Sequence, residues 1–322
     1  MFSLFPIKFD DLVKSQEFPP PRRGRVRVGV VSGWIQSCLF PLPFVPSRRG
    51  RGKWTFDESI KFINRSNLKR FAVLIALLLS IAACATTPWN QEQADSHLNI
   101  GRAYLGSERY NEALKEFLQA EKFAPRDPKV HYYMGASYYM KGMSDQATDA
   151  FIKALSYDSN YSEAHNFLGT VYLEKGLWDK AIESLKHALS DTLYDTPDKA
   201  LFNMGRAYHG KGDYRMALNK YHEAKNTRPN TVPSVVIEQH MGMAGFAQGN
   251  MEEAVSHFKK ALEIVPSFTE IHYWLGRCYV KLNNLAGARA EFQHVIKTAP
   301  ESELAAEARK ALNSIGASQQ RP

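Results

Sequence analysis

The sequence predicts an all-α fold: a solenoid of about six helix-turn-helix repeats with a C-terminal capping helix, within residues 94–316. The first observation is a set of glycines, here called the phase glycines, separated by 34, 34, 36, 37 and 34 residues. They are Gly101, Gly135, Gly169, Gly205, Gly242 and Gly276. The second is that residues at fixed distances after them share a type. The residues three positions after the phase glycines are Tyr104, Tyr138, Tyr172, Tyr208, Gly245 and Tyr279. Those twelve positions after are Ala113, Ala147, Ala181, Ala217, Ala254 and Ala288. Those sixteen positions after are Phe117, Phe151, Leu185, Tyr221, Phe258 and Phe292.

These residue types have a steric reason at these positions. A glycine and an alanine on facing helices let the two helices of a hairpin approach closely, and the large side chains fill the space between that hairpin and the next. A proline stops the second helix in four repeats, at Pro125, Pro229, Pro266 and Pro300, and is replaced by Ser159 and Leu193 in the second and third.

The period of 34 residues is that of the tetratricopeptide repeat, so residues 94–316 resemble that family. The resemblance implies paired antiparallel helices that act as a protein-binding scaffold. The segment Glu301 to Gly316 reads as an amphipathic helix that caps the last apolar face. Residues 317–322 are expected to be a disordered tail.

A short export signal is expected in front of the repeats. Lys69 and Arg70 precede an apolar run from Phe71 to Ile81, and two alanines then precede Cys84. The run is shorter than the roughly 20 apolar residues of a membrane span. It resembles the lipobox of bacterial lipoproteins, which implies a signal peptide over residues 68–83, a lipid such as palmitate on Cys84 and a lipidated linker over residues 84–93. The alternative is a buried helix that ends in an inert cysteine.

The charge of the chain is concentrated before the repeats. Residues 1–84 hold 14 Lys and Arg against 5 Asp and Glu, and residues 85–322 hold 27 against 28. Nucleic-acid binding needs a basic face on the folded part, so the charge balance argues against it. Residues 1–67 are interpreted as a disordered basic extension or as sequence assigned by a start codon upstream of the true one near Leu68; a genuine cytoplasmic extension is the alternative.

No enzyme signature is present: the sequence has no phosphate loop, HExxH or GxSxG motif. We therefore expect no catalysis, cofactor, metal or small-molecule substrate. Four histidines, His97, His131, His165 and His272, each stand four residues before a phase glycine. Neighbouring repeats would hold the rings about 10 Å apart, too far to share a zinc ion at roughly 2 Å, so packing is the favoured interpretation. Cys278 is expected to be a small core residue.

The first helices of such an array line its concave face, and the phase indicates which side chains enter it. The candidates are Tyr132, Tyr139, Met140, Asn166, Phe202, Arg206, His209, Met243, Phe246, Tyr273 and Arg277. Aromatic residues, Met and Arg are enriched where proteins bind proteins. The alternative is that several of them only pack between repeats.

A lipobox joined to six such repeats resembles the type IV pilus biogenesis and stability lipoproteins, or pilotins, over residues 69–314. The stretch HALSDTLYDTPDKALFNMG, residues 187–205, is similar to the insertion these proteins carry between their third and fourth repeats. Gly245, Ser159 and Leu193 depart from the repeat pattern.

The resemblance implies an outer-membrane lipoprotein, on the periplasmic face, that binds subunits of the pilus secretin and promotes their assembly. Ala85 fits that address, since an aspartate at this position retains many lipoproteins at the inner membrane. The alternatives are a lipidated scaffold for cell-wall enzymes or polysaccharide export, and an enzyme with an unrecognised site.

Overall fold

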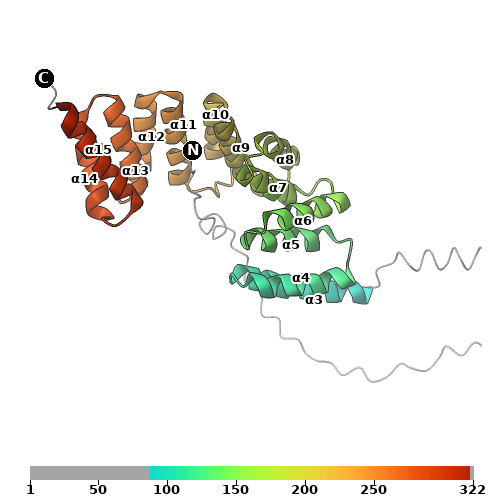
Figure 1. Cartoon of the computed structure of the whole chain (residues 1–322). Coiled ribbons are helices and arrows are strands. Elements are labelled where there is room, and N and C mark those ends of the chain that lie inside the picture. The colour runs from blue at the N-terminus through green and yellow to red at the C-terminus, as the bar shows by residue number, and fades with distance from the viewer. Residues whose placement is uncertain (1–87, 320–322) are drawn as a thin grey trace, which may run out of the picture. The chain divides into compact units, whose positions relative to one another are not determined.

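The computed structural model describes residues 88–319, and the regular elements in this range are thirteen α-helices (Figure 1). They are α3 (Pro88–Gly106), α4 (Tyr110–Phe123), α5 (Pro128–Met140), α6 (Ser144–Tyr157), α7 (Ser162–Glu174), α8 (Trp178–Ser190), α9 (Pro197–Lys211), α10 (Tyr214–Asn226), α11 (Ser234–Gln248), α12 (Met251–Ile264), α13 (Thr269–Lys281), α14 (Leu285–Thr298) and α15 (Glu303–Gln319). Residues 1–87, with the predicted signal and Cys84, lie outside this range.

The helices pair in chain order as six hairpins, from α3 with α4 to α13 with α14, and α15 packs on α14. The predicted solenoid of six repeats with a capping helix is therefore confirmed. The backbone of each first helix also approaches that of the first helix in the next repeat. The backbones of the second helices α4, α6, α8, α10, α12 and α14 do not approach one another in this way, although the Lys153 side chain of α6 reaches Glu121 of α4 at 2.8 Å. The first helices, here called the inner row, thus lie closer together and form the concave side of the array. The second helices form the outer row.

Each phase glycine lies beneath the large side chain sixteen residues later in its own hairpin. A β-carbon on Gly101 would lie 2.4 Å from Phe117 Cε1, and one on Gly205 would lie 2.5 Å from Tyr221 Cε1. The six large side chains are fully buried, as are the six alanines twelve residues after the glycines. Some of the rings also reach the next repeat: Phe151 stacks on Phe167, with ring centroids 5.6 Å apart. The period thus reports contacts within a hairpin as well as between hairpins.

The turn inside each hairpin has the same backbone geometry in all six repeats. The amide eight residues after the phase glycine donates to the carbonyl three residues after it, at 2.8–2.9 Å. In every repeat the residue seven positions after the phase glycine, just before the donating amide, has a positive φ. These residues are Glu108, Gly142, Gly176, Gly212, Gly249 and Asn283. Because the conserved element is a backbone carbonyl, Gly245 forms the same turn as the tyrosines of the other repeats.

Both ends of the array differ from the prediction. The helix α3 begins at Pro88, so residues 88–93, predicted as linker, are helical; proline is well suited to the first turn, where its missing N–H is not needed. The helix α15 extends to Gln319, so residues 317–319, predicted as disordered, are helical too. No helix between residues 88 and 319 combines the length and apolar character that a bilayer crossing needs.

Two longer connections account for the repeat spacings of 36 and 37 residues. Between α8 and α9, Tyr194 is buried against the core and accepts a hydrogen bond from the Thr196 hydroxyl at 3.0 Å, whereas Leu193 is 86% exposed. Between α10 and α11, the buried carboxylate of Asp198 accepts hydrogen bonds from Thr231 and from the Val232 amide, the latter at 2.8 Å. Both insertions are therefore fixed to the array.

Candidate binding face on the inner row

The structure places all eleven predicted groove residues on the inner row and divides them by burial. The side chains of Met140, Arg206, His209, Met243, Phe246 and Arg277 are partly exposed. Those of Tyr132, Tyr139, Asn166, Phe202 and Tyr273 are buried. The exposed set can meet a partner directly, and the buried set supports it.

Phe202 and Tyr132 are core residues rather than groove residues. Phe202 is 1% exposed, with its ring centroid 5.5 Å from that of Tyr221 and 5.0 Å from that of His240. Tyr132 packs against the rings of the next repeat, including Phe167 at 5.6 Å. The position three residues before the phase glycine faces the following hairpin, so a large ring there fills the gap between repeats. The interpretation as packing, left open by the sequence, is the correct one for these two.

A polar cluster crosses from α7 to α9. The Asn203 amide donates to Asn166 Oδ1 at 3.2 Å and to Thr170 Oγ1 at 3.1 Å. Arg206 Nη1 donates to Asn203 Oδ1 at 3.2 Å, so a neutral oxygen holds its guanidinium. The sequence singled out Asn166 and Arg206 but missed Thr170 and Asn203. A signal was available: Thr170 and Arg206 both follow directly after a phase glycine.

Two glutamates of the inner row and α15 are engaged by tyrosine hydroxyls. Tyr139 donates to Glu174, and Tyr273 donates to Glu307 of α15. Burial, followed by the bond to Glu307, raises the pKa of Tyr273 to about 12. Both tyrosines therefore stay protonated and act as donors. Neither glutamate was predicted, because each partner lies one repeat further along the chain.

Arg277 lies among aromatic rings of α11 and α13. Its guanidinium carbon is 4.6 Å from the Trp274 ring centroid, 4.8 Å from that of Phe246 and 5.9 Å from that of Tyr273. Such cation–π contacts orient a guanidinium without neutralising it. A planar cation on an apolar platform is a common anchor at protein interfaces.

Three of the four recurrent histidines connect their own repeat to the turn before it. His131 Nε2 lies 2.8 Å from the Pro125 carbonyl oxygen, and His165 and His272 make the equivalent bonds at 3.0 and 2.9 Å. Burial lowers the pKa of His131 and favours its neutral form. Among residues 88–319 no three His, Cys, Asp or Glu side chains are placed to hold a metal ion. His131 is 1% exposed and its ring lies 5.3 Å from that of Tyr157, so it packs within the array as predicted.

A histidine and a glutamate nineteen residues apart also bridge the two helices of three hairpins. In the first and sixth repeats the histidine is on the inner row: His97 lies 2.7 Å from Glu116, and His272 lies 2.6 Å from Glu291. In the fifth repeat the two types are exchanged, with Glu238 on α11 and His257 on α12, 2.7 Å apart. Because the histidine–glutamate pair is kept when the two residues exchange helices, the pair serves to join the two helices of the hairpin.

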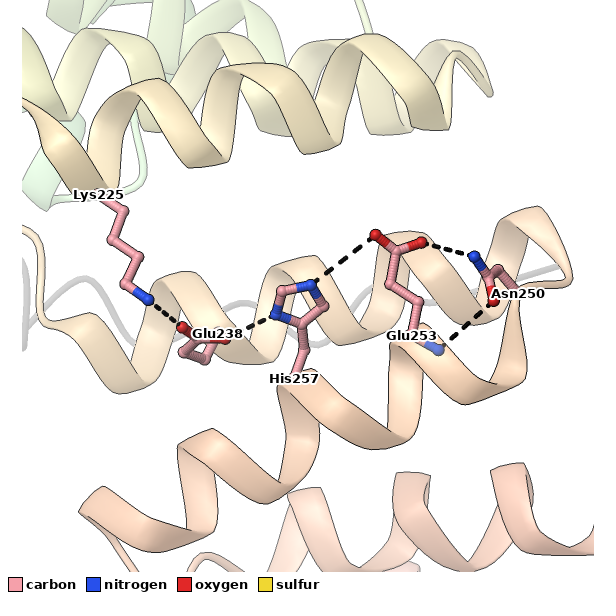
Figure 2. A network of polar contacts seen from close by, with 5 residues as sticks. All are labelled: Lys225, Glu238, Asn250, Glu253 and His257. Carbon is pink, nitrogen blue, oxygen red and sulfur yellow. Dashed lines mark hydrogen bonds and ion pairs between the residues drawn. The ribbon is translucent and has the colours of Figure 1, made fainter.

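Glu238 joins two repeats as well as two helices (Figure 2). It is 1% exposed, and its other oxygen accepts a hydrogen bond from Lys225 of α10 at 2.5 Å. Burial by itself raises the pKa of Glu238, but the hydrogen bonds from His257 and Lys225 outweigh it and lower the pKa to about 2. Glu253 extends this series of polar contacts to Asn250, whose side-chain amide donates a hydrogen bond to Glu253 at 2.8 Å. Glu238 and His257 are buried in the packing between helices, whereas Lys225, Glu253 and Asn250 extend the network toward the surface, so its buried centre is structural.

Cys278 is fully buried, as predicted for a core residue. Burial raises the pKa of its thiol to about 12. A thiol that stays protonated at neutral pH is a poor nucleophile.

Comparisons with known proteins agree with the helix hairpins. Models of the tetratricopeptide repeat match residues 101–142, 134–196, 200–232 and 246–312. Among curated proteins, the CTR9 homolog of Arabidopsis thaliana is 32% identical over 88 residues, and the photosystem I assembly protein Ycf3 of Acaryochloris marina is 30% identical over 87 residues. These matches span 27% and 23% of this chain, and only 8% and 52% of the two relatives.

Two solved structures share the fold over nearly their whole length. PilF of Pseudomonas aeruginosa has a TM-score of 0.60 and 16% identity, over 69% of this chain and 99% of its own. PilW, described as a widely conserved type IV pilus biogenesis factor, has a TM-score of 0.62 and 18% identity, over 66% of this chain and 97% of its own. At these identities the likeness concerns the fold. With six hairpins of the expected period and four matching repeat models, the chain is a tetratricopeptide repeat protein.

Proposed function

We propose that the chain is a lipid-anchored scaffold, a pilotin, that binds secretin subunits and promotes their assembly at the outer membrane during type IV pilus biogenesis. The observation that carries the proposal is a juxtaposition. The lipobox cysteine Cys84 stands four residues before Pro88, the first residue of the six-hairpin array. The structural match of this array includes 99% of the PilF chain and 97% of the PilW chain.

The two parts have different tasks in this proposal. Acyl chains on Cys84 anchor the protein, because each buried CH₂ group contributes about 0.8 kcal/mol to membrane binding. The inner row, with its partly exposed Arg, Met and aromatic side chains, supplies recognition.

Capture from the envelope tests the proposal. The full chain with a C-terminal affinity tag is purified from solubilised envelope of its own organism, and bound proteins are identified by mass spectrometry. Secretin subunits are expected, enriched at least tenfold over a strain that produces only the tagged outer-membrane lipid anchor. Recovery of cell-wall enzymes or polysaccharide-export proteins without secretin would replace this proposal with the alternative scaffold.

A further inference from the structure

The residues directly after the last three phase glycines form a row across consecutive first helices. They are Arg206 on α9, Met243 on α11 and Arg277 on α13, and all three are partly exposed on the inner row. The row therefore reads as cation, apolar side chain, cation.

Both arginines are held in place by neutral groups. Arg206 donates to the amide oxygen of Asn203, and Arg277 lies against the rings of Trp274 and Phe246. Neither forms an ion pair with a carboxylate in the part of the chain that the structure describes, where ion pairs involve other side chains. A guanidinium offers five donors in a plane, so most of the donors of each arginine lack an acidic partner.

Two glutamates on or beside this face bond to tyrosine hydroxyls, and neither forms an ion pair with Arg206 or Arg277. Glu174 accepts from Tyr139, and Glu307 accepts from Tyr273. Residues 85–322 are close to neutral overall, with 27 Lys and Arg against 28 Asp and Glu, so electrostatic attraction of a partner depends on where individual charges lie. Positioned cations that no carboxylate contacts directly favour an anionic partner.

We infer that the inner row of the fourth to sixth repeats binds an extended acidic segment of a partner protein, with a carboxylate at Arg206, a large apolar side chain over Met243 and Phe246, and a second carboxylate at Arg277. Two repeats separate the arginines, roughly 20 Å at usual helix spacings. An extended chain rises about 3.3 Å per residue, so the carboxylates stand about six residues apart. The inference rests on the proposed function only in naming the same face as the recognition surface.

A designed peptide tests the spacing. The probe is the fluorescein-labelled nonapeptide Gly-Asp-Ser-Leu-Ser-Leu-Ser-Asp-Gly, in which both aspartates and both leucines lie on one side of an extended strand. Its binding to the full chain, purified in detergent, is followed by fluorescence anisotropy. We expect that replacing both aspartates with asparagine weakens binding at least tenfold, and that raising the salt concentration weakens only the acidic peptide.

Variants of the protein test the two arginines. Arg206→Met and Arg277→Met each keep an apolar stem and should weaken binding of the acidic peptide at least fivefold. Arg215→Met removes an exposed charge from the outer-row helix α10 and should change nothing. Circular dichroism establishes that each variant is folded.

Equal binding of the aspartate and asparagine peptides would overturn the inference, and this outcome needs no variant. Unchanged binding by folded Arg206→Met and Arg277→Met would overturn it as well. The peptide assay is independent of secretin. Arginine-dependent peptide binding without capture of secretin would refute only the proposed function, and the reverse result would refute only this inference.

Discussion

Glu108 adopts a backbone conformation that its side chain disfavours. Its φ is 60°, at the turn position where four other repeats have glycine. A residue with a β-carbon pays about 1–2 kcal/mol in the left-handed region, whereas glycine enters it freely. The first repeat thus retains a local strain that the second to fifth repeats lack.

Replacing Glu108 with glycine should stabilise the protein. We expect the free energy of unfolding to rise by about 0.5–1 kcal/mol, since the relief of strain exceeds the entropy that glycine adds to the unfolded chain. The matched control is Gly142→Ala, at the same turn position with φ 72° and open space around it, which should lower stability by about 1 kcal/mol. Urea unfolding followed by circular dichroism measures both. A destabilising Glu108→Gly or a stabilising Gly142→Ala would show that this turn geometry does not govern stability.

Glu238 should make stability depend on pH in the acid range. Its pKa falls from 4.5 to about 2 on folding, so its contribution is complete above pH 4.5 and is lost as the pH falls toward 2. Because the side chain is buried, the contribution is on the order of 2–3 kcal/mol at neutral pH. The stability difference between the parent and Glu238→Gln should therefore shrink between pH 4.5 and pH 2. A difference that stays constant across this range in urea titrations would contradict the assignment.

At the scale of the helix hairpin, the phase glycines set how closely the two helices approach. Gly205→Ala would place a β-carbon 2.5 Å from the ring of buried Tyr221, and should cost about 1–3 kcal/mol. Gly316→Ala, in α15 with nothing within 4 Å, should instead stabilise by about 0.5–1 kcal/mol. Thermal unfolding of the two variants gives the comparison. If both alanines acted alike, helix propensity rather than close packing would explain the glycines.

The hairpins could be predicted from the sequence because their determinants are local. A glycine, an alanine twelve residues on and a large side chain sixteen residues on meet within one repeat, so spacing alone reports the contact. The contacts between repeats could not be predicted in the same way. Periodicity predicted that Phe202 lies on the inner row, but it could not predict that the next hairpin buries this side chain. The hydrogen bond from Asn203 to Thr170 likewise depends on the register between α7 and α9.

At the scale of the whole molecule, the anchor and the array should be separable. Cys84→Ser should abolish incorporation of labelled fatty acid and release the protein from the membrane fraction, because it removes the thiol that would carry the lipid. The circular dichroism spectrum of the released protein should match that of the parent, since each repeat packs only on its neighbours. A variant that stays as firmly bound to membranes would reveal another anchor and refute the lipobox interpretation.

The central claim is that the inner row of a lipid-anchored array promotes secretin assembly. The most direct measurement is the amount of detergent-resistant secretin multimer in cells that lack the gene and are complemented with the parent, with Arg215→Met or with the double variant Arg206→Met, Arg277→Met. We predict normal secretin monomer but few multimers in the deletion strain, recovery with the parent and with Arg215→Met, and little recovery with the double variant. Normal multimer levels in the deletion strain itself would contradict the claim.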